Sequence, residues 1–196
     1  MLKRLFDIIA SLLGIIILIP FLFIICIFIV AGSGFPVFYL QTRVGKEGKD
    51  FNLFKFRTMA NNSDKKGLLT IGGRDSRVTK IGYYLRKYKL DELPQLLNVF
   101  IGDMSLVGPR PEVRKYVNLY NDMQKKVLHV KPGITDLASI EFFDENEMLG
   151  KSLNPEQTYI TEVMPKKLEL NLLYIDQRGF IMDLKIICNT LLKIVK

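Results

Sequence analysis

The longest uncharged part of the chain includes Ile8 to Gln41 and ends just before Arg43, and it constrains the fold more than any other feature. Its first 23 residues, Ile8 to Val30, are mostly isoleucine, leucine, phenylalanine and valine. At a rise of about 1.5 Å per residue, a helix of this length reaches across a hydrocarbon core of roughly 30 Å. The stretch is longer than a typical signal-peptide core, and no cleavage pattern of small residues follows it. A second long uncharged stretch is missing from the sequence, which argues against a transporter with several membrane spans.

The charges on either side of this stretch favour the same side of a membrane. Lys3 and Arg4 precede it, and a strongly basic domain follows it. A single span cannot keep both basic ends on the cytoplasmic side. Pro20 lies near the middle, and a proline there kinks a helix. We therefore predict that residues 1–32 form a re-entrant helix hairpin bent at Pro20, and that residues 33–196 form a cytoplasmic, membrane-associated domain; a simple signal anchor is the alternative.

The chain is basic, and this charge restricts its partners. It carries 28 lysines and arginines against 20 aspartates and glutamates, a formal net charge of +8 at pH 7. A basic domain beside a membrane is typical of proteins that bind anionic lipid, a phosphorylated substrate or nucleic acid. Cys26, Cys188 and His129 are too few and too scattered for a typical transition-metal site or a disulfide framework.

The rest of the sequence predicts a small α+β domain that is mostly helical. Two short strands are expected at 36–40 and 51–56, joined as a hairpin by a Gly- and Lys-rich turn over 43–50. A polar loop is expected over 61–77, and 144–159 carries no clear pattern. Helices are expected at 81–88, 94–100, 111–127, 165–174 and 182–195.

The last expected helix is amphipathic. Its apolar stripe consists of Ile181, Leu184, Ile187, Leu191 and Ile194, with lysines elsewhere. Such a stripe either faces the protein core or lies against the membrane interface with the lysines toward the headgroups. The pattern leaves both interpretations open.

The densest group of reactive side chains surrounds Asp91 and Glu92, just before Pro94. Proline after acidic residues is typical of a helix start, so the two carboxylates could simply cap a helix. The same geometry suits phosphate chemistry. Free backbone N–H groups bind phosphate oxygens, and a carboxylate can bind Mg²⁺ with substrate phosphates or attack phosphorus to form an acyl phosphate. Adjacent side chains on a helix point about 100° apart, so we expect the two carboxylates to have different roles.

Basic residues flank this acidic pair. Lys55 and Arg57 lie in the second expected strand, Arg86 precedes the pair, and Arg110 follows it. Arg110 stands between two prolines, and a stiff turn lowers the entropy cost of a bidentate phosphate contact. Lys87 and Lys89 also precede the pair; their charge fits phosphate chemistry, but a solvated face is the favoured interpretation for both.

Several motifs, in order along essentially the whole chain, carry a family resemblance. They are Gln41-Thr42-Arg43-Val44-Gly45, Lys55-Phe56-Arg57-Thr58-Met59, Leu90-Asp91-Glu92-Leu93-Pro94-Gln95, Gly102-Asp103-Met104-Ser105-Leu106-Val107-Gly108-Pro109-Arg110-Pro111, Lys131-Pro132-Gly133-Ile134-Thr135 and Asp183-Leu184-Lys185-Ile186. In these motifs the chain resembles the small monotopic bacterial phosphoglycosyl transferases, the initiating sugar transferases of glycoconjugate assembly. The motifs are specific together, whereas an Asp-Glu pair alone would not be.

The resemblance implies a catalytic domain on the cytoplasmic face of the bacterial inner membrane. Such enzymes transfer a sugar-1-phosphate from a UDP-sugar to undecaprenyl phosphate and release UMP, which initiates glycoconjugate or polysaccharide assembly. Asp91 matches the nucleophile on which a phospho-sugar intermediate forms, and Glu92 would assist it. Mg²⁺, with Asp91 as its expected protein ligand, would neutralise the diphosphate.

The resemblance also implies a set of substrate-binding residues. Arg110, held by Pro109 and Pro111, would bind substrate phosphate. The remaining basic residues expected near the substrate are Lys55, Arg57 and Arg86. Their separate roles are not distinguished by the motifs.

Two departures from the family pattern limit what the resemblance implies. Ile19-Pro20 stands where members often have Ser-Pro, so only the proline is available for the kink. Residues 136–141, Asp-Leu-Ala-Ser-Ile-Glu, replace a common Gly-rich continuation, and we expect this region to bear on the choice of sugar. The identity of the donor sugar is therefore left open.

A non-enzymatic interpretation competes with the transferase. A membrane-tethered basic module that binds nucleic acid or anionic lipid would explain the charge and the apolar stretch, and a lipid-phosphate phosphatase is a third interpretation. The basic module does not explain the Asp-Glu-Leu-Pro and Gly-Pro-Arg-Pro segments. No aromatic-basic RNA motif is visible, so we expect no nucleic-acid partner. A homodimer is compatible with the sequence, which does not decide the oligomeric state.

Overall fold

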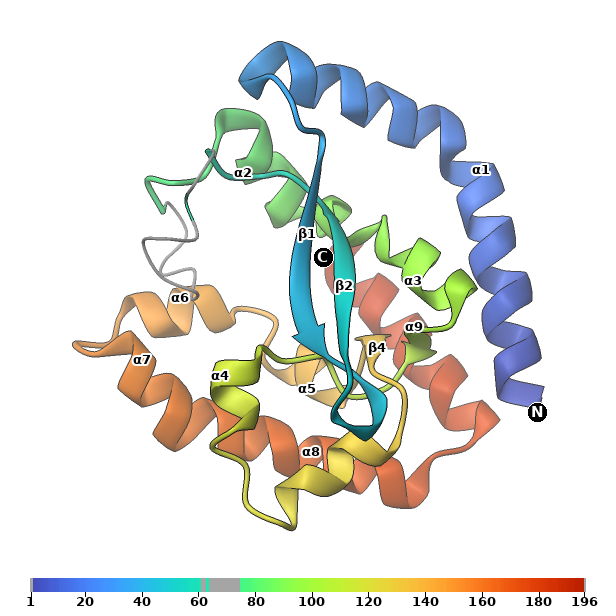
Figure 1. The fold of residues 1–196 in the computed structure, drawn as a ribbon, viewed down its shortest axis with the longest axis vertical. Helices are drawn as coiled ribbons and strands as arrows, with labels where there is room; N and C mark the ends of the chain where they lie inside the picture. The colour runs from blue at the N-terminus through green and yellow to red at the C-terminus, as the bar shows by residue number, and fades with distance from the viewer. Residues whose placement is uncertain (1, 61–62, 64–74, 196) are drawn as a thin grey trace.

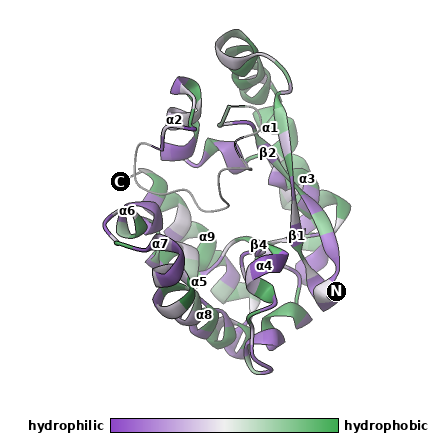
Figure 2. Ribbon diagram, turned by 60° about the vertical axis from the view of Figure 1, so that its left-hand side comes forward, coloured by the Kyte–Doolittle hydropathy of each residue, from purple (hydrophilic) through white to green (hydrophobic). Residues whose placement is uncertain are grey.

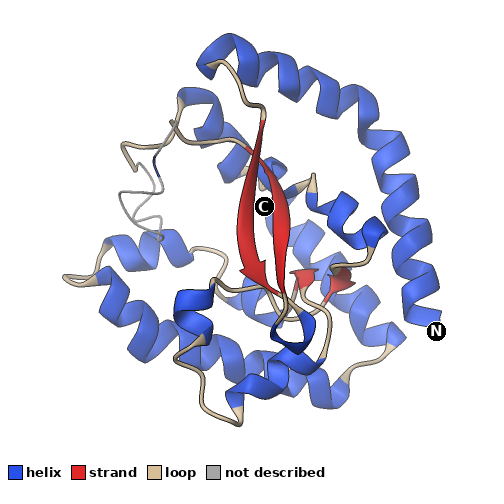
Figure 3. Cartoon of the chain, in the orientation of Figure 1, coloured by secondary structure: helices blue, strands red, loops and turns tan. Residues whose placement is uncertain are grey.

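A computed structural model describes all residues except 1, 61–62, 64–74 and 196. The described chain is mostly helical, with two small sheets (Figure 3). The α-helices are α1 (Leu2–Ser33), α2 (Lys80–Lys87), α3 (Gln95–Ile101), α4 (Arg114–Val117), α5 (Leu137–Glu141), α6 (Glu145–Gly150), α7 (Pro155–Thr158), α8 (Met164–Gln177) and α9 (Phe180–Val195). The strands are β1 (Phe38–Val44), β2 (Asp50–Phe56), β3 (Ser105–Val107) and β4 (Gly133–Thr135). Short 3-10 segments are η1 (Lys46–Gly48), η3 (Leu90–Glu92) and η4 (Gln124–His129), and η5 (Tyr159–Val163) is a π-helical turn. The predicted α+β class with a β-hairpin is confirmed.

Most of the uncharged stretch, residues 8–33, lies in a single long helix, α1, with Pro20 inside it. The helix changes direction along its length (Figure 1), and most of it is coloured hydrophobic in Figure 2. Only 11% of its most apolar 18-residue window is buried. By length and composition α1 could therefore cross a membrane.

The charged residues at the start of α1 bind the globular part of the chain. Lys3 forms an ion pair with Asp183 of α9. Arg4 donates to two backbone carbonyls in the last turn of α3, at 2.6 and 2.9 Å. Asp7 is buried and accepts a hydrogen bond from the backbone N–H of Leu106 at 3.0 Å. The first turns of α1 are therefore fixed to the domain.

The other end of α1 is held by one arginine. Arg57 follows β2, is buried, and donates to the carbonyl oxygens of Ser33 at 2.8 Å and Phe35 at 2.7 Å. It also donates to the Ser33 hydroxyl at 3.0 Å. These bonds satisfy carbonyls that the helix end leaves without intrahelical partners. Both ends of α1 are thus attached to the same domain.

The predicted β-hairpin is present, with shifted boundaries. β1 and β2 pair antiparallel from Phe38↔Phe56 to Val44↔Asp50. The first strand begins later than expected and continues through part of the expected turn. The connection is consequently short, and it contains η1 and a left-handed Gly48 at φ 70°.

A second, parallel pair of strands, β3 and β4, was not predicted. Two glycines allow the chain to pass closely here: a Cβ on Gly133 would lie 2.1 Å from the Gly108 nitrogen. Gly108 is equally confined, because its Cβ would lie 2.5 Å from the carbonyl oxygen of Lys131. The glycines of two separate sequence motifs therefore meet, and they bring the turn around Arg110 beside the segment that follows β4.

The helix predicted over 111–127 is wrong. Residues there form only the one-turn α4 and the 3-10 segment η4. Between them, Asn121 and Gln124 exchange side-chain-to-backbone hydrogen bonds of 2.9 Å, a local alternative to helical bonding. The helices expected near α2, α3, α8 and α9 are present. Most of the loop expected over 61–77 lies outside the described residues.

The apolar stripe predicted for the last helix is not its buried face. In α9 the buried residues include Asp183 and Ile186, whereas Ile181 and Leu191 are exposed. Ile187, in the same stripe, is half-buried and packs beside the cluster that contains Ile186. Part of the stripe is thus left uncovered by the protein.

Candidate active site

Asp91 and Glu92 lie in η3, immediately before α3. The N-cap of α3 is Pro94, three residues after Asp91, so the expectation that Asp91 caps this helix is wrong. Asp91 is 6% exposed. Among the residues that the structure describes, none forms a hydrogen bond or ion pair with its carboxylate. A buried carboxylate without a direct partner is costly, and such groups concentrate at functional sites.

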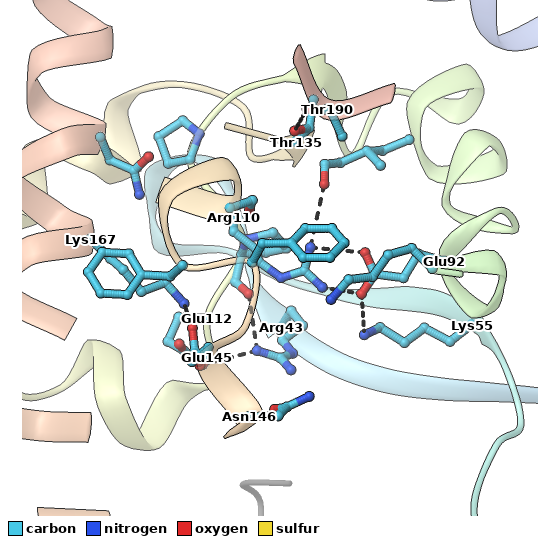
Figure 4. A pocket seen from close by; sticks show the side chains of 18 of the residues that line it. Arg43, Lys55, Glu92, Arg110, Glu112, Thr135, Glu145, Asn146, Lys167 and Thr190 are labelled. Carbon is cyan, nitrogen blue, oxygen red and sulfur yellow. Dashed lines mark hydrogen bonds and ion pairs between the residues drawn. The ribbon is translucent and has the colours of Figure 1, made fainter. Parts of the chain in front are cut away.

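Glu92 is in a different situation, because both of its oxygens are bound. Arg110 forms a bidentate ion pair with Glu92: its Nη1 lies 2.9 Å from Oε2, and its Nη2 donates to Oε1. Lys55 donates to the same Oε1 at 3.2 Å, reaching it from β2. Figure 4 shows Arg110 and Lys55 converging on Glu92. Glu92 therefore positions two cations and has no oxygen left free of them.

These surroundings shift the pKa values of Asp91 and Glu92 in opposite directions. Burial raises the pKa of Asp91 and the adjacent Glu92 adds to the rise, against the opposing effects of Lys55 and Arg86. Burial also acts to raise the pKa of Glu92, but Arg110 and Lys55 outweigh it and hold that pKa well below its usual range. Burial lowers the pKa of Lys55, and Glu92 opposes this change.

These side chains border a cavity of about 460 Å³, a size that suits a small-molecule ligand. The predicted site residues that line it are Lys55, Arg86, Asp91, Glu92, Pro109, Arg110 and Pro111. Arg57 is the exception, since it does not line the cavity and its guanidinium holds the end of α1. The position of Arg57 therefore argues against the substrate-binding role that was expected for it.

The turn that carries Arg110 is fixed by Asp136, which sequence reasoning did not select. Asp136 is fully buried, and its Oδ2 accepts the backbone N–H of Arg110 at 2.9 Å. Its Oδ1 accepts the backbone N–H of Ser139 at 2.6 Å and so caps α5. An aspartate just before a helix is a recognisable N-cap signal, but its second bond, to a residue 26 positions away, is not visible in the sequence.

Replacing Asp136 by asparagine should weaken both bonds at once. The change removes the charge that strengthens them, and we expect a loss of about 1–3 kcal/mol in the free energy of unfolding. The measurement is the thermal unfolding midpoint, with Asp122→Asn as the matched control because the side chain of Asp122 is fully exposed. Equal midpoints for the two variants would contradict a fixing role for Asp136.

A second polar group on the cavity wall was also missed. Arg43 pairs with Glu112 at 3.0 Å, and Tyr159 donates its hydroxyl hydrogen bond to the same carboxylate. Burial raises the pKa of Tyr159, and the charge of Glu112 raises it further. Arg43 belongs to one of the family motifs and Glu112 directly follows another, so the motifs contained a signal for both residues. Tyr159 lies at the end of the stretch without a pattern.

The two lysines expected on a solvated face differ. Lys87 is exposed, as predicted. Lys89 lines the cavity, its ammonium lies 4.9 Å from the ring centre of Phe143, and its backbone is left-handed at φ 54°. The prediction for Lys89 is therefore wrong.

Asp91 is the residue that fits the expected magnesium ion. Within the described part of the chain, no group of three or more His, Cys, Asp or Glu side chains could hold a metal by itself. Mg²⁺ commonly takes one or two protein carboxylates and completes its shell with water and substrate phosphates. The carboxylate of Asp91, which no described residue pairs with, suits that arrangement, whereas Glu92 is already bound to Arg110 and Lys55.

Asp91 therefore combines burial, the lack of a hydrogen-bond or ion-pair partner among the described residues, and a surrounding of basic side chains, in a domain attached to an apolar helix. Over residues 1–196 the sequence matches the family described as bacterial sugar transferase. The chain belongs to the bacterial sugar transferase family, and it is an enzyme of the transferase class. This membership does not favour the non-catalytic basic module.

Individual relatives support the same assignment. The chain is 42% identical to the uncharacterized sugar transferase EpsL of Bacillus subtilis, over 99% of this chain and 87% of that protein. It is 39% identical to the UDP-glucose:undecaprenyl-phosphate glucose-1-phosphate transferase of Klebsiella pneumoniae, over 97% of this chain and 39% of that protein. It is 35% identical to the UDP-N-acetylgalactosamine-undecaprenyl-phosphate N-acetylgalactosaminephosphotransferase of Aeromonas hydrophila, over 96% of this chain and 42% of that protein. The chain spans most of EpsL and less than half of the two relatives whose names state a donor.

Proposed function

We propose that this protein transfers a sugar-1-phosphate from a UDP-sugar to undecaprenyl phosphate and releases UMP. The names of the Klebsiella and Aeromonas relatives support this donor and acceptor. The single observation that carries the mechanism is the carboxylate of Asp91, which is buried, has no direct partner among the described residues and borders a cavity lined by basic side chains. The product would initiate a glycoconjugate or polysaccharide.

In the first half-reaction an oxygen of Asp91 attacks the β-phosphorus of the donor. The bond from that phosphorus to the bridging oxygen breaks, and UMP leaves with this oxygen. The sugar phosphate remains on Asp91 as an acyl phosphate. Lys55, Arg86 and Arg110 border the cavity where the diphosphate charge would lie, and charge neutralisation and positioning dominate phosphoryl transfer.

In the second half-reaction the phosphate of the lipid attacks the same phosphorus. The Asp91–phosphorus bond breaks, the carboxylate is regenerated, and the lipid diphosphate sugar is released. Apolar side chains line another part of the cavity and suit the hydrocarbon end of such an acceptor: Leu93, Leu96, Ile187, Leu191 and Ile194. Before the first half-reaction, while the donor diphosphate is intact, Mg²⁺ held by Asp91 and the donor phosphates would supply additional charge neutralisation.

The attachments of α1 support a re-entrant arrangement in the membrane. A straight helix of 32 residues would separate its ends by about 48 Å. Both ends of α1 are instead bonded to one domain, through Lys3, Arg4 and Asp7 at the start and through Arg57 at the end. With the basic domain on the cytoplasmic face of the inner membrane, α1 would enter and leave by that face, and the exposed stripe of α9 would lie in the interface.

Single cysteines should test this topology. In a variant without Cys26 and Cys188, we expect Leu2→Cys and Phe35→Cys to react with a membrane-impermeant maleimide only from the cytoplasmic side, because both side chains are well exposed in the structure (69% and 74%). Leu153→Cys, on the surface of the domain, is the control for that side. Labelling of Phe35→Cys only from outside intact cells would refute the re-entrant arrangement.

The activity itself is tested with purified protein in nanodiscs. UMP release is measured for a panel of UDP-sugars with Mg²⁺, with and without undecaprenyl phosphate. We expect one donor class to give UMP, and we expect multiple turnovers only with the lipid. Release of inorganic phosphate from undecaprenyl phosphate without any UDP-sugar would support the phosphatase interpretation. Salt-sensitive nucleic-acid binding by a folded protein that releases no UMP from a broad panel would support the basic module.

A further inference from the structure

The cavity has a second polar region on the side of Arg110 away from Glu92. Glu145 and Lys167 form an ion pair of 2.7 Å there, opposite Lys55 and Glu92 in Figure 4. Asn171 follows Lys167 by one turn of α8, and it lines the same cavity. Residues four apart lie on the same helix face. This part of the cavity wall is therefore polar, and the positive charge of Lys167 is already neutralised by Glu145.

Asn171 is an unusual residue for its position in α8. The buried residues of this helix are Met164, Leu168, Asn171 and Tyr174, so a polar amide interrupts an apolar face. Asn171 is only 4% exposed, and its Oδ1 has no hydrogen-bond partner among the described residues. Buried polar atoms are nearly always bonded, which makes an unpaired amide beside a cavity a candidate ligand-binding group.

Ser139 of α5 is a second residue of the cavity lining that carries an unpaired polar atom in the described structure. Its Oγ is buried without a partner in the described structure, while its backbone N–H is held by Asp136. Asp136 also holds the backbone of Arg110. The backbones of Ser139 and Arg110 are therefore both held by one carboxylate.

Unpaired buried atoms alone do not mark a site. Ser105 and Gln95 also carry them, and neither residue lines the cavity. Asn171 and Ser139 differ because they combine an unpaired polar atom with a place on the wall of the cavity that contains Asp91.

We propose that Asn171 and Ser139 bind the sugar ring of the donor and select an uncharged hexose or N-acetylhexosamine. This inference rests on the proposed transfer of a sugar phosphate. The Asn171 carbonyl oxygen needs a donor, which a ring hydroxyl or an acetamido N–H supplies, and the Ser139 hydroxyl can donate or accept. Glu145 and Lys167 neutralise each other in that part of the wall. The carboxylate of a uronic acid or the ammonium of a free amino sugar would therefore find no unpaired opposite charge in this pair.

The test compares donors that differ at one ring substituent. UMP release is measured for the wild type, Asn171→Leu and Ser139→Ala with the preferred UDP-sugar and with its deoxy analogues. We expect each variant to lose roughly tenfold in kcat/KM for the full donor, as for one lost hydrogen bond. For the analogue that lacks the bound group, wild type and variant should be equal within about twofold.

Binding supplies a readout that is independent of turnover. UMP lacks the sugar, so its dissociation constant should be the same for the wild type and both variants, whereas that of the UDP-sugar should rise in the variants. Ser105→Ala is the matched control, because it removes a buried, unpaired hydroxyl that lies outside the cavity. We expect this control to leave the ratio of the two dissociation constants unchanged.

The outcomes separate this inference from the proposed function. A wild type that releases no UMP from any donor would contradict the proposed function itself. A wild type that turns over normally, with Ser139→Ala and a folded Asn171→Leu that keep its relative kcat/KM for every donor, would overturn the sugar site alone. If Asn171→Leu does not fold, the Ser139→Ala comparison decides.

Discussion

Replacement of Asp91 by asparagine is expected to abolish turnover, with a residual rate below about one thousandth of the wild type. A carboxamide keeps the shape of the side chain but has no anionic oxygen to attack phosphorus. The measurement is UMP release with the preferred donor. Intact-protein mass spectrometry without the lipid acceptor is a second readout: the wild type should gain the mass of one sugar phosphate, and Asp91→Asn should gain none.

The matched control for this variant is Asp176→Asn. Asp176 is an exposed residue of α8 that does not line the cavity, so its replacement should leave turnover unchanged. Full activity of Asp91→Asn, in a preparation free of wild-type protein, would remove Asp91 from the role of nucleophile.

The same substitution should not destabilise the protein. Because the pKa of Asp91 is raised in the folded state, folding favours its protonated form. The free energy of unfolding therefore falls as the pH rises from the ordinary pKa of an unfolded aspartate to the raised value, and at neutral pH the ionised carboxylate is unfavourable. With a chelator present, we expect a higher unfolding midpoint for Asp91→Asn than for the wild type at pH 7. A lower midpoint would mean that Asp91 has a structural role.

Replacement of Arg110 by alanine has the second largest expected effect. Arg110 is the bidentate partner of Glu92 and borders the cavity, so its removal takes away a phosphate-binding fork and releases Glu92 to the cavity. We expect the kcat/KM for the donor to fall by about 100-fold or more. Arg110→Lys should recover only part of this loss, because an ammonium cannot reproduce the planar fork. An unchanged donor kcat/KM would refute the role in substrate binding.

Arg114→Ala is the control for the loss of a nearby arginine. Arg114 pairs with Asp50 on the surface, and it does not line the cavity. Its removal should leave the donor kcat/KM within about twofold of the wild type, since exposed ion pairs contribute little.

Arg110→Ala should also change the dependence of stability on pH. The depressed pKa of Glu92 stabilises the fold above the ordinary pKa of an unfolded glutamate, and this contribution is lost only as the pH falls through the depressed value. Arg110 is the strongest of the charges that depress this pKa. Without it, acid unfolding followed by circular dichroism should begin at a higher pH than in the wild type.

Local sequence pattern was enough to predict the parts of the protein that depend on near neighbours. Hydropathy predicted the extent of α1, and alternation with a turn between predicted the β1–β2 hairpin. The motifs and the basic residues near them predicted seven side chains that line one cavity, and three of these, Pro109, Arg110 and Pro111, stand on one short, stiff turn. These features depend on residues only a few positions apart, so their signal is present in any short window of the sequence.

The tertiary structure alone decided the features made by distant segments. Arg57 shares a motif with Lys55, but its neighbour in space is the end of α1, and its guanidinium is bonded there. Asp136 holds the backbone of Arg110 because two glycines let β3 and β4 approach. In the sequence Asn171 is an ordinary polar residue, and only the packing of α8 shows that it is buried and lines the cavity. A hydrogen bond depends on distance in space, which chain order does not encode, and so the grouping of these side chains around one cavity is decided only when the helices pack.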